Sequence, residues 1–401
     1  MNIYIPKDVE YIINKFYENG YEAFMVGGCV RDSLLGKTPT DYDITTSAPP
    51  NITQKLFNKT IPTGIKHGTI TVIINNNSYE VTTYRTEENY IDNRRPDKVN
   101  FVTNIKEDLS RRDFSINAFA YNNKEGLLDF FNGQTDLNNK LIKCVGDANT
   151  RFNEDALRML RAIRFSSQLD FDIDKKTYLS IKDNYKLISN ISKERIRDEF
   201  IKMLLCNNPA KGLNYLIETN IYSIIFENVS EPNNFNNISY LPKDICIRTT
   251  ALLKDNNPDK VKVLLKNLRF TNNEINTIYI FISNYNLLGN HLSKIEIKNI
   301  IATVGKEKII SLINMYETLE ETSLDNLKHT VNLIISNDEA LYIKDLNIDG
   351  SILKDNFEIK SGKIIGDTLN YLLKLVMDET IDNDTSLLIK EADRYIKNKV
   401  Y

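Results

Sequence analysis

Two kinds of hydrophobic pattern divide the chain. Over the first 145 residues, short apolar runs and alternating apolar and polar positions predict β-strands with a few helices between them. From Gly146 onward, apolar residues recur every three or four positions almost to the end, which predicts helices. We therefore predict an α+β head followed by an all-α remainder. The predicted parts are a head over 1–145, a neck over 146–205, a body over 206–315 and a tail over 316–401.

One stretch of the head carries the candidate chemistry. Glu22–Val26 has the length and composition of a buried strand, and Gly27–Gly28 allows a sharp turn beside a bulky anion. Residues 29–35 predict a helix whose first N–H groups would face a phosphate. Asp41 and Asp43 are two residues apart in a predicted strand, so both carboxylates would lie on one face and could share divalent cations. These parts together suit nucleotidyl transfer.

A hairpin is predicted next, with strands over 68–74 and 79–84. Alternation in the second strand places Glu80 on one face with Thr82, which makes Glu80 a candidate third acid beside Asp41 and Asp43. The alternative is an ordinary exposed glutamate. The charged segment 85–99 predicts a mobile loop. Apolar runs over 127–131 and 141–145 are expected to complete the sheet of the head.

Charged residues recur along a predicted helix over 151–164. One face carries apolar side chains, and the other carries Asp155, Arg158, Arg161 and Arg164 at intervals of three residues. Such a stripe is usually a solvated face. A second amphipathic helix is predicted over 191–205, with Ser192 at its N-cap.

Composition narrows the class of protein only slightly. The formal net charge of −3 does not favour a nucleic-acid binder, although a local basic region is compatible with one. Four scattered cysteines lack metal-ligand spacing and suit reduced thiols, and the chain has neither a signal-peptide pattern nor an apolar run of membrane-spanning length. We therefore expect a cytoplasmic protein with no membrane association and no obligate protein partner.

Several motifs together resemble one family. Gly-Gly-x-x-Arg-Asp followed by Asp-x-Asp is similar to the head of the class II tRNA nucleotidyltransferases, the CCA-adding enzymes, and of the related bacterial poly(A) polymerases of the polymerase-β superfamily. Arg-Arg-Asp-Phe-Ser-Ile-Asn-Ala over 111–118 resembles the ribose-recognition motif of that family, with Ser115 in place of threonine. Glu-Asp-x-x-Arg over 154–158 resembles its base-selecting motif. The family implies a polymerase-β-type mixed sheet in the head.

The resemblance gives the charged residues roles. The implied nucleotide-binding residues are Gly28, Arg31, Arg112, Asp113, Asp155, Arg158, Arg161 and Arg164. Cytosine and adenine both present an amino donor beside a ring-nitrogen acceptor, so an aspartate that accepts and an arginine that donates would match both. Arg161 and Arg164 would serve the triphosphate or orient the face that carries Asp155. Arg195 and Glu199 would brace the base-selecting helix.

The resemblance implies template-independent addition of C, C and A to the 3′ end of tRNA from CTP and ATP. Asp41 and Asp43 would hold two Mg²⁺ ions that activate the tRNA 3′-hydroxyl and stabilise the leaving pyrophosphate, with Glu80 as a further catalytic acid. Enzymes that add only A, and poly(A) polymerases, remain alternatives within the family. A non-catalytic RNA-binding relative is the alternative from another class.

Overall fold

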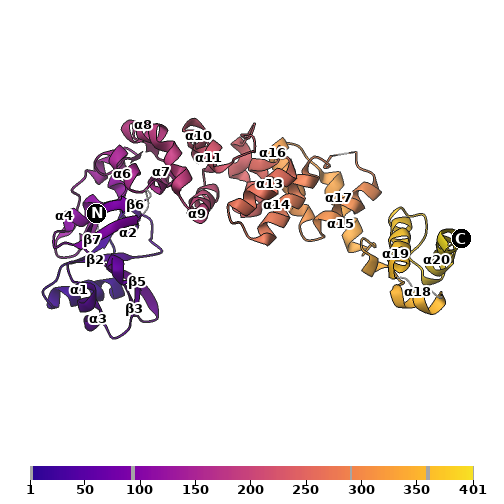
Figure 1. Ribbon diagram of the computed structural model, residues 1–401, viewed down its shortest axis with the longest axis horizontal. Coiled ribbons are helices and arrows are strands. Elements are labelled where there is room, and N and C mark those ends of the chain that lie inside the picture. The colour runs from indigo at the N-terminus through magenta and orange to yellow at the C-terminus, as the bar shows by residue number, and fades with distance from the viewer. Residues whose placement is uncertain (1–2, 92–94, 290, 358–361, 401) are drawn as a thin grey trace. The chain divides into compact units, whose positions relative to one another are not determined.

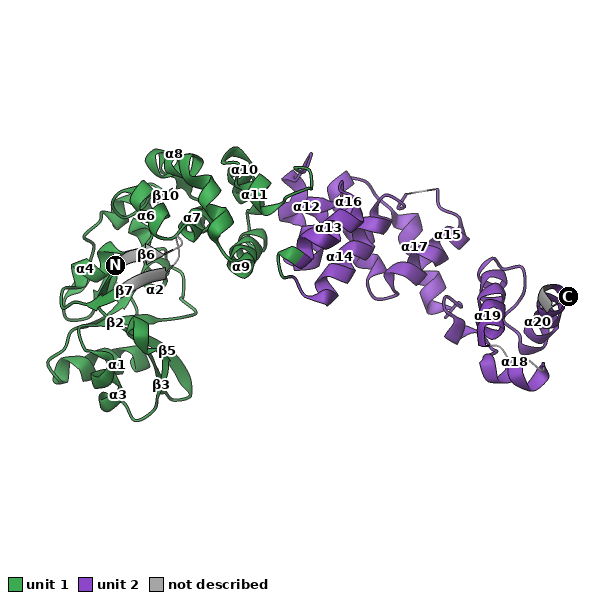
Figure 2. Ribbon diagram, viewed as in Figure 1, with its two compact units in different colours: residues 1–231, 267–269 green, residues 232–266, 270–401 purple. Residues whose placement is uncertain are grey.

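The computed structural model describes residues 3–91, 95–289, 291–357 and 362–400. The chain forms two compact units (Figure 2). Unit 1 contains residues 1–231 with 267–269, and unit 2 contains residues 232–266 with 270–401. No helix among the described residues is long and apolar enough to cross a membrane.

A seven-stranded mixed sheet forms the centre of the head. The strand order is β3-β4-β5-β2-β1-β8-β9. Its strands are β1 (Ala23–Val26), β2 (Asp43–Thr46), β3 (Thr60–Gly64), β4 (Thr69–Ile74), β5 (Asn77–Thr83), β8 (Ala120–Asn122) and β9 (Gly126–Leu128). β2 and β5 run parallel, whereas the other named neighbours pair antiparallel. The expected α+β head is confirmed.

Apolar side chains cover both faces of this sheet, as alternation along its strands requires. On one face, Ala23, Ile44 and Val81 pack with helix α1 (Lys7–Glu18), whose buried positions lie three or four residues apart. On the other face, Phe24 and Val26 pack with helix α4 (Ile105–Ser110). The head is completed by α2 (Gly28–Leu34), α3 (Pro50–Leu56), α5 (Gly133–Asn138) and the short helices η1 (Ile65–His67) and η2 (Ser115–Asn117).

The segment predicted as a loop over 85–99 is instead a β-ribbon. Strands β6 (Arg85–Ile91) and β7 (Arg95–Phe101) pair antiparallel as a separate two-stranded sheet. Charge along the segment suggested irregular structure, but cross-strand pairing needs only extended backbone, so polar residues can form such a ribbon. Residues 92–94 lie outside the described part of the chain.

The last expected strand of the head belongs elsewhere. β10 (Leu141–Ile142) pairs in parallel with β11 (Asp172–Ile173), so it does not complete the seven-stranded sheet. An apolar run predicts a buried strand without identifying its partner, which explains the error. The rest of this part of unit 1 is helical (Figure 1), with α6 (Ala148–Glu154), α7 (Leu157–Leu169), α8 (Lys175–Asn184), η3 (Tyr185–Asn190), α9 (Lys193–Leu204), α10 (Pro209–Glu218) and α11 (Ile221–Ile225).

The described residues of unit 2 are helical, as the 3.6-residue pattern predicted. The helices are η4 (Asn236–Tyr240), α12 (Ile245–Leu253), α13 (Pro258–Asn267), α14 (Asn272–Tyr285), α15 (Lys294–Val304), α16 (Ile309–Glu320), α17 (Asp325–Ser336), η5 (Ile343–Asp345), α18 (Gly350–Asn356), α19 (Gly362–Met377) and α20 (Thr385–Val400). Capping boxes at Thr271 and Ser293 begin α14 and α15. The last helices share an apolar cluster that includes Leu353, Leu369 and Leu388.

Candidate nucleotide-binding site

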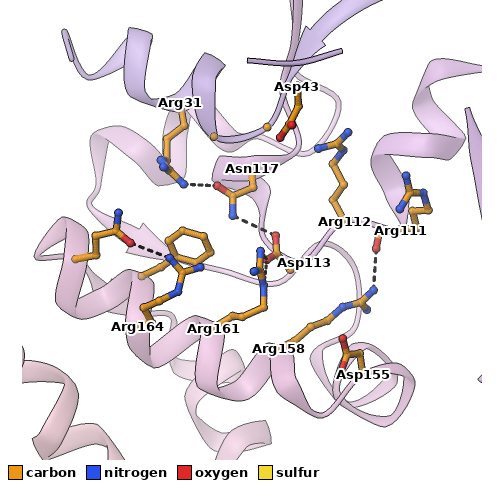
Figure 3. Close-up of a pocket in the computed structure, with 14 residues that line it drawn as sticks. Arg31, Asp43, Arg111, Arg112, Asp113, Asn117, Asp155, Arg158, Arg161 and Arg164 are labelled. Carbon is orange, nitrogen blue, oxygen red and sulfur yellow. Dashed lines mark hydrogen bonds and ion pairs between the residues drawn. The ribbon is translucent and has the colours of Figure 1, made fainter. Parts of the chain in front are cut away.

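An arginine-rich pocket of about 400 Å³ lies in unit 1, between the sheet of the head and helix α7 (Figure 3). Six arginines and three aspartates line it, which gives the lining a formal excess of three positive charges. The chain as a whole carries −3. The lining residues are Gly27, Gly28, Arg31, Asp43, Arg111, Arg112, Asp113, Asn117, Asp155, Arg158, Arg161, Arg164, Phe165 and Gln168. Such a lining suits a polyanionic ligand.

The Gly-Gly turn brings backbone close to this pocket. Gly27 has φ +77°, a conformation that side-chain-bearing residues rarely adopt, and a Cβ there would lie 3.0 Å from Nη1 of Arg112. Gly28 begins α2, and its added Cβ would meet only Arg31 at 3.6 Å. The predicted nucleotide-binding residue Gly28 thus lines the pocket, but Gly27 is the glycine that the geometry requires.

Asp43 reaches the pocket from the first position of β2. Burial raises the pKa of its carboxyl, with Arg112 opposing and Glu80 and Asp41 adding to the rise. The β2–β5 register pairs Ile44 with Val81, so Asp43 and Glu80 occupy adjacent positions on the same face of the sheet. Negative charge is therefore concentrated at this point of the sheet.

The structure corrects the strand placement of Asp41. β2 begins at Asp43, and Asp41 lies before it in non-strand backbone, where its carboxylate accepts from the Thr40 hydroxyl at 3.3 Å. Neither Asp41 nor Glu80 is among the pocket-lining residues. Strand periodicity therefore does not explain why Asp41 lies near Asp43. Asp41 is nevertheless close enough to raise the pKa of Asp43.

The second motif forms a hydrogen-bonded chain across the pocket (Figure 3). Arg31 donates from Nη1 to Oδ1 of Asn117 at 2.6 Å, and Asn117 donates from Nδ2 to Oδ1 of Asp113 at 3.1 Å. Arg161 then donates to Oδ2 of Asp113 at 2.8 Å. Burial alone would raise the pKa of Asp113, but Arg161 and Asn117 hold it at about 2. Asp113 is thus an ionised carboxylate that orients the donors around it.

Arg112 differs from these residues because one of its donors has no hydrogen-bond acceptor. Its Nε is buried without a partner among the described residues, and its Nη2 lies 3.5 Å from Asp108. Helix α4 ends at Ser110, so Arg112 and Asp113 lie in the connection between α4 and η2. A buried unpaired N–H is costly, which favours an acceptor supplied by a ligand.

The predicted continuous helix over 151–164 is broken at Asp155. α6 ends at Glu154, Asp155 is extended with φ −137° and ψ 104°, and α7 begins at Leu157. The Asp155 carboxylate accepts from the Leu157 backbone N–H at 3.1 Å, as N-capping aspartates do. Hydrophobic periodicity continues through such a break, so the sequence pattern did not reveal it. Asp155 and Arg158 therefore belong to a helix junction.

The side chains of this junction are held firmly. Arg158 donates to Oε2 of Glu154 at 2.5 Å and to the Arg111 carbonyl at 3.0 Å. Arg195 lies 3.0 Å from Oδ2 of Asp155. Arg195 of α9 thus braces Asp155, as expected.

The other brace involves Glu199, which lies one helical turn further along α9. Its Oε2 accepts from Nε of Arg164 at 2.6 Å, and its Oε1 lies 3.8 Å from Nη1 of Arg161. Arg164 also donates to Gln168 at 2.8 Å. Arg161 and Arg164 therefore have acidic partners, and both still line the pocket. Nine of the eleven predicted site residues meet at this pocket, with Asp41 and Glu80 outside its lining.

Sequence reasoning missed Arg111, Asn117, Phe165 and Gln168 as lining residues. Arg111 and Asn117 belong to the quoted ribose motif, so their signal was available. Phe165 lies four residues after Arg161 and seven after Arg158, so helical spacing places it on the charged face, and this signal was also available.

A fully buried carboxylate connects several of these parts. Asp108 accepts from Nη2 of Arg111 at 2.8 Å, from the Arg85 backbone N–H at 3.2 Å and from the Thr45 hydroxyl at 3.4 Å. Burial opposes ionisation, but Arg111 and Arg112 keep its pKa below the usual value. Arg111 also donates to Glu87 at 3.2 Å. The base of the β6–β7 ribbon is thereby joined to the pocket.

Fold and site together define the class as a polymerase-β-type nucleotidyltransferase, and comparison with solved structures agrees. The *Bacillus stearothermophilus* CCA-adding enzyme, solved in complex with CTP, matches with a TM-score of 0.83 and 26% identity over 98% of this chain and 100% of that one. The *Thermotoga maritima* CCA-adding enzyme complexed with tRNA shares the fold, with a TM-score of 0.69 and 22% identity over 98% and 97% of the two chains.

Sequence comparisons identify the family. Three family models match in succession: "Poly A polymerase head domain" over 23–143, "Probable RNA and SrmB-binding site of polymerase A" over 170–231, and the tRNA nucleotidyltransferase domain 2 model over 246–392. A CCA-adding enzyme of *Ligilactobacillus salivarius* is 37% identical over 97% of this chain and 96% of its own length. One of *Staphylococcus aureus* is 34% identical over 96% and 97%. The chain belongs to the family of CCA-adding enzymes.

Proposed function

We propose that this chain adds C, C and A in turn to the 3′ end of tRNA, using CTP and ATP and releasing pyrophosphate. The observation that carries the proposal is one pocket that contains Asp43, the arginines, and the pair Asp155 and Arg158. A nucleoside triphosphate presents matching parts, namely a reacting phosphorus, a polyphosphate and a base edge. Full-length relatives at 34% and 37% identity bear the name of this activity.

Base selection is assigned to Asp155 and Arg158. The Asp155 carboxylate can accept a hydrogen bond from the amino group of cytosine or adenine, and the Arg158 guanidinium can donate to the adjacent ring nitrogen. Uracil and guanine present the opposite order of donor and acceptor, and each buried mismatch costs roughly 1–3 kcal/mol. Because Glu154 and Arg195 fix the pair, the protein can select bases without a nucleic-acid template.

A divalent cation belongs to the chemistry of this family, and we assign Mg²⁺ to Asp41 and Asp43. Negative charge concentrated around Asp43 fits a hard cation. Among the residues that the structure describes, no group of three or more His, Cys, Asp or Glu side chains is arranged to hold a metal. A two-carboxylate site suits Mg²⁺, which commonly takes its other ligands from substrate phosphates and water. When bound, two such ions would activate the attacking hydroxyl and stabilise the leaving pyrophosphate.

The remaining roles belong to the chain itself. Glu80 lies beside Asp43 across the β2–β5 pairing, and it would act as the third acid of the site. Arg112 would bind an oxygen of the bound nucleotide through the N–H that has no protein acceptor. Arg31, Asp113, Arg161 and Arg164 would hold the polyphosphate and sugar in line with the tRNA hydroxyl, so that little reorganisation is needed at the reaction step.

The test is incubation of the chain with tRNA lacking its terminal CCA, in the presence of Mg²⁺ and labelled CTP or ATP. Separate substrates that end before the first C, the second C and the A distinguish full CCA addition from A-only addition, and extension beyond the first A would indicate a poly(A) polymerase. Incorporation at all three steps, and no further, is expected. Binding of tRNA without any incorporation would contradict the proposal and favour a non-catalytic RNA-binding protein.

Asp41→Asn and Asp43→Asn test the acidic site, because each removes a charge that a hard cation requires. Incorporation of C and of A should each fall by at least about 100-fold, a loss typical of removing a charge-stabilising group from an active site. Affinity for tRNA should stay near that of the unmodified chain. Asp183→Asn on α8, at an exposed position, is the matched control. Turnover near normal in either site variant would refute the assignment.

A further inference from the structure

Three arginines of the pocket converge on one aromatic ring. The guanidinium carbon of Arg164 lies 3.8 Å from the ring centroid of Phe165, that of Arg31 lies 5.1 Å away, and that of Arg161 lies 5.4 Å away. These arginines come from two helices, α2 and α7. The ring is 6% exposed and packs edge-on against Phe114 at 5.9 Å, which fixes its orientation.

The electrostatics of this arrangement need explanation, because like charges that share a small volume repel. Carboxylates offset part of the repulsion: Asp32 pairs with Arg31, Asp113 with Arg161 and Glu199 with Arg164. Each carboxylate also occupies guanidinium donors. An aromatic face attracts a guanidinium through the ring quadrupole and takes up no N–H donor. Phe165 thus stabilises the gathered cations without competing for the donors that an anion needs.

We propose that Phe165 is a positioning residue that holds Arg31, Arg161 and Arg164 as a preformed cluster for the polyphosphate of the incoming nucleoside triphosphate. The inference rests on the proposed function and adds to it an aromatic residue that helical spacing places on the same face as Arg158 and Arg161. All three arginines line the pocket together with Phe165. Because CTP and ATP carry the same polyphosphate, the effect should be the same for both nucleotides.

Two substitutions separate the ring face from simple packing. Phe165→Leu keeps an apolar side chain and removes the aromatic face, whereas Phe165→Tyr keeps the face. Phe171→Leu is the matched control, because Phe171 is 4% exposed, lies just beyond α7 and does not line the pocket. The melting temperature of each variant shows how much general stability the change removes.

The first measurement is the steady-state KM and kcat for single additions from CTP and from ATP. For Phe165→Leu we expect KM to rise about tenfold for both nucleotides, while discrimination against UTP and GTP is preserved. Phe165→Tyr should match the unmodified chain. A KM change for only one nucleotide, an unchanged KM in Phe165→Leu, or an equal rise in Phe171→Leu would overturn the proposal.

The second measurement is direct binding of inorganic tripolyphosphate by calorimetry. This probe has the polyphosphate charge and no base, so its affinity should fall about tenfold in Phe165→Leu and stay unchanged in Phe165→Tyr. Equal affinity in Phe165→Leu and the unmodified chain would refute the role of the ring. Because this assay needs no catalysis, it tests Phe165 even if the unmodified chain fails to extend tRNA, which would refute only the proposed function.

Discussion

At the scale of single residues, the charges around the pocket are paired before any nucleotide arrives, and this pairing should be visible in the pH dependence of stability. The pKa of Asp113 is held at about 2 by Arg161 and Asn117, whereas an unperturbed aspartate has a pKa of about 3.9. A carboxyl whose folded pKa is depressed contributes stability above the unfolded pKa and loses it as the pH falls through the folded value.

Asp113→Asn should therefore cost about 2 kcal/mol of unfolding free energy at pH 6, from the difference between the two pKa values. The difference from the unmodified chain should shrink between pH 4 and pH 2, since protonation then removes the same charge. Urea unfolding at several pH values measures both quantities. A difference that stayed constant down to pH 2 would show that the ion pair with Arg161 does not lower this pKa.

Arg158 and Asp155 carry the second prediction at this scale. Arg158→Ala removes the donor to the base, and Asp155→Ala removes the acceptor, so each should weaken CTP and ATP together. Hydrogen bonds to charged groups are worth about 1.5–3 kcal/mol. The preference of the enzyme for CTP and ATP over UTP and GTP should therefore fall by roughly 10- to 100-fold. Competition assays with all four nucleotides measure it. Full discrimination in either variant would place base selection elsewhere.

At the scale of elements, the β6–β7 ribbon is the candidate for the switch from C to A. One pair of side chains must read a small pyrimidine and then a larger purine, so the pocket has to change shape between steps. The ribbon reaches that pair through defined contacts: Glu87 accepts from Arg111, and the Arg111 carbonyl accepts from Arg158. A ribbon with two conformations could move Arg158 through this path.

The test is deletion of Asn89–Arg94, of which residues 92–94 lie outside the described chain. The deletion should leave both C additions largely intact and reduce A addition by at least about tenfold. Such a loss would mark a conformational step in A addition. Gel analysis of products on tRNA lacking CCA measures the ratio of chains ending in A to chains ending in the second C. The same variant assayed for C addition alone serves as the internal control. A normal ratio would show that the ribbon has no part in the switch.

Elements also show where sequence reasoning succeeded and where it failed. The strand, Gly-Gly turn and helix over residues 23–34 were predictable because local rules determine each of them. Alternation predicted which face of its strand Glu80 occupies, but only the β2–β5 pairing shows that Glu80 lies beside Asp43. The break at Asp155 and the partner of β10 were not predictable, because apolar periodicity records burial and not backbone continuity or strand partners.

At the scale of the whole molecule, the two units should respond separately to mutation. In unit 2, Lys298 is 3% exposed and joins α15 to the end of α19: its Nζ lies 2.8 Å from Glu339, 3.2 Å from Glu379 and 3.2 Å from the Met377 carbonyl. The four-part division of the chain, with a tRNA-binding tail over 316–401, remains a prediction. This contact joins the predicted tail to α15, which belongs to the predicted body.

Lys298→Met should destabilise unit 2 by about 1–3 kcal/mol, because the Met377 carbonyl and the partly buried Glu339 each lose a donor, although Lys294 still pairs with Glu339. We expect KM for tRNA to rise while KM for CTP stays unchanged, since the pocket belongs to unit 1. Lys306→Met is the control: its pair with Asp338 is exposed and should be worth less than about 1 kcal/mol. An equal rise in KM for CTP would contradict separate roles for the units.

The extended residue between α6 and α7 has a consequence for the unfolded chain. Asp155 already has backbone angles that a following proline tolerates, and Ala156 has φ −61°, the value that a pyrrolidine ring imposes. Ala156→Pro should therefore remove conformational freedom from the denatured ensemble without straining the backbone, a gain of about 0.4–1 kcal/mol in unfolding free energy, which packing of the added ring atoms at this fully buried position would reduce. Thermal unfolding measures the gain. Altered nucleotide selection in a variant that is as stable as the unmodified chain, or more stable, would show that the junction changes conformation during addition.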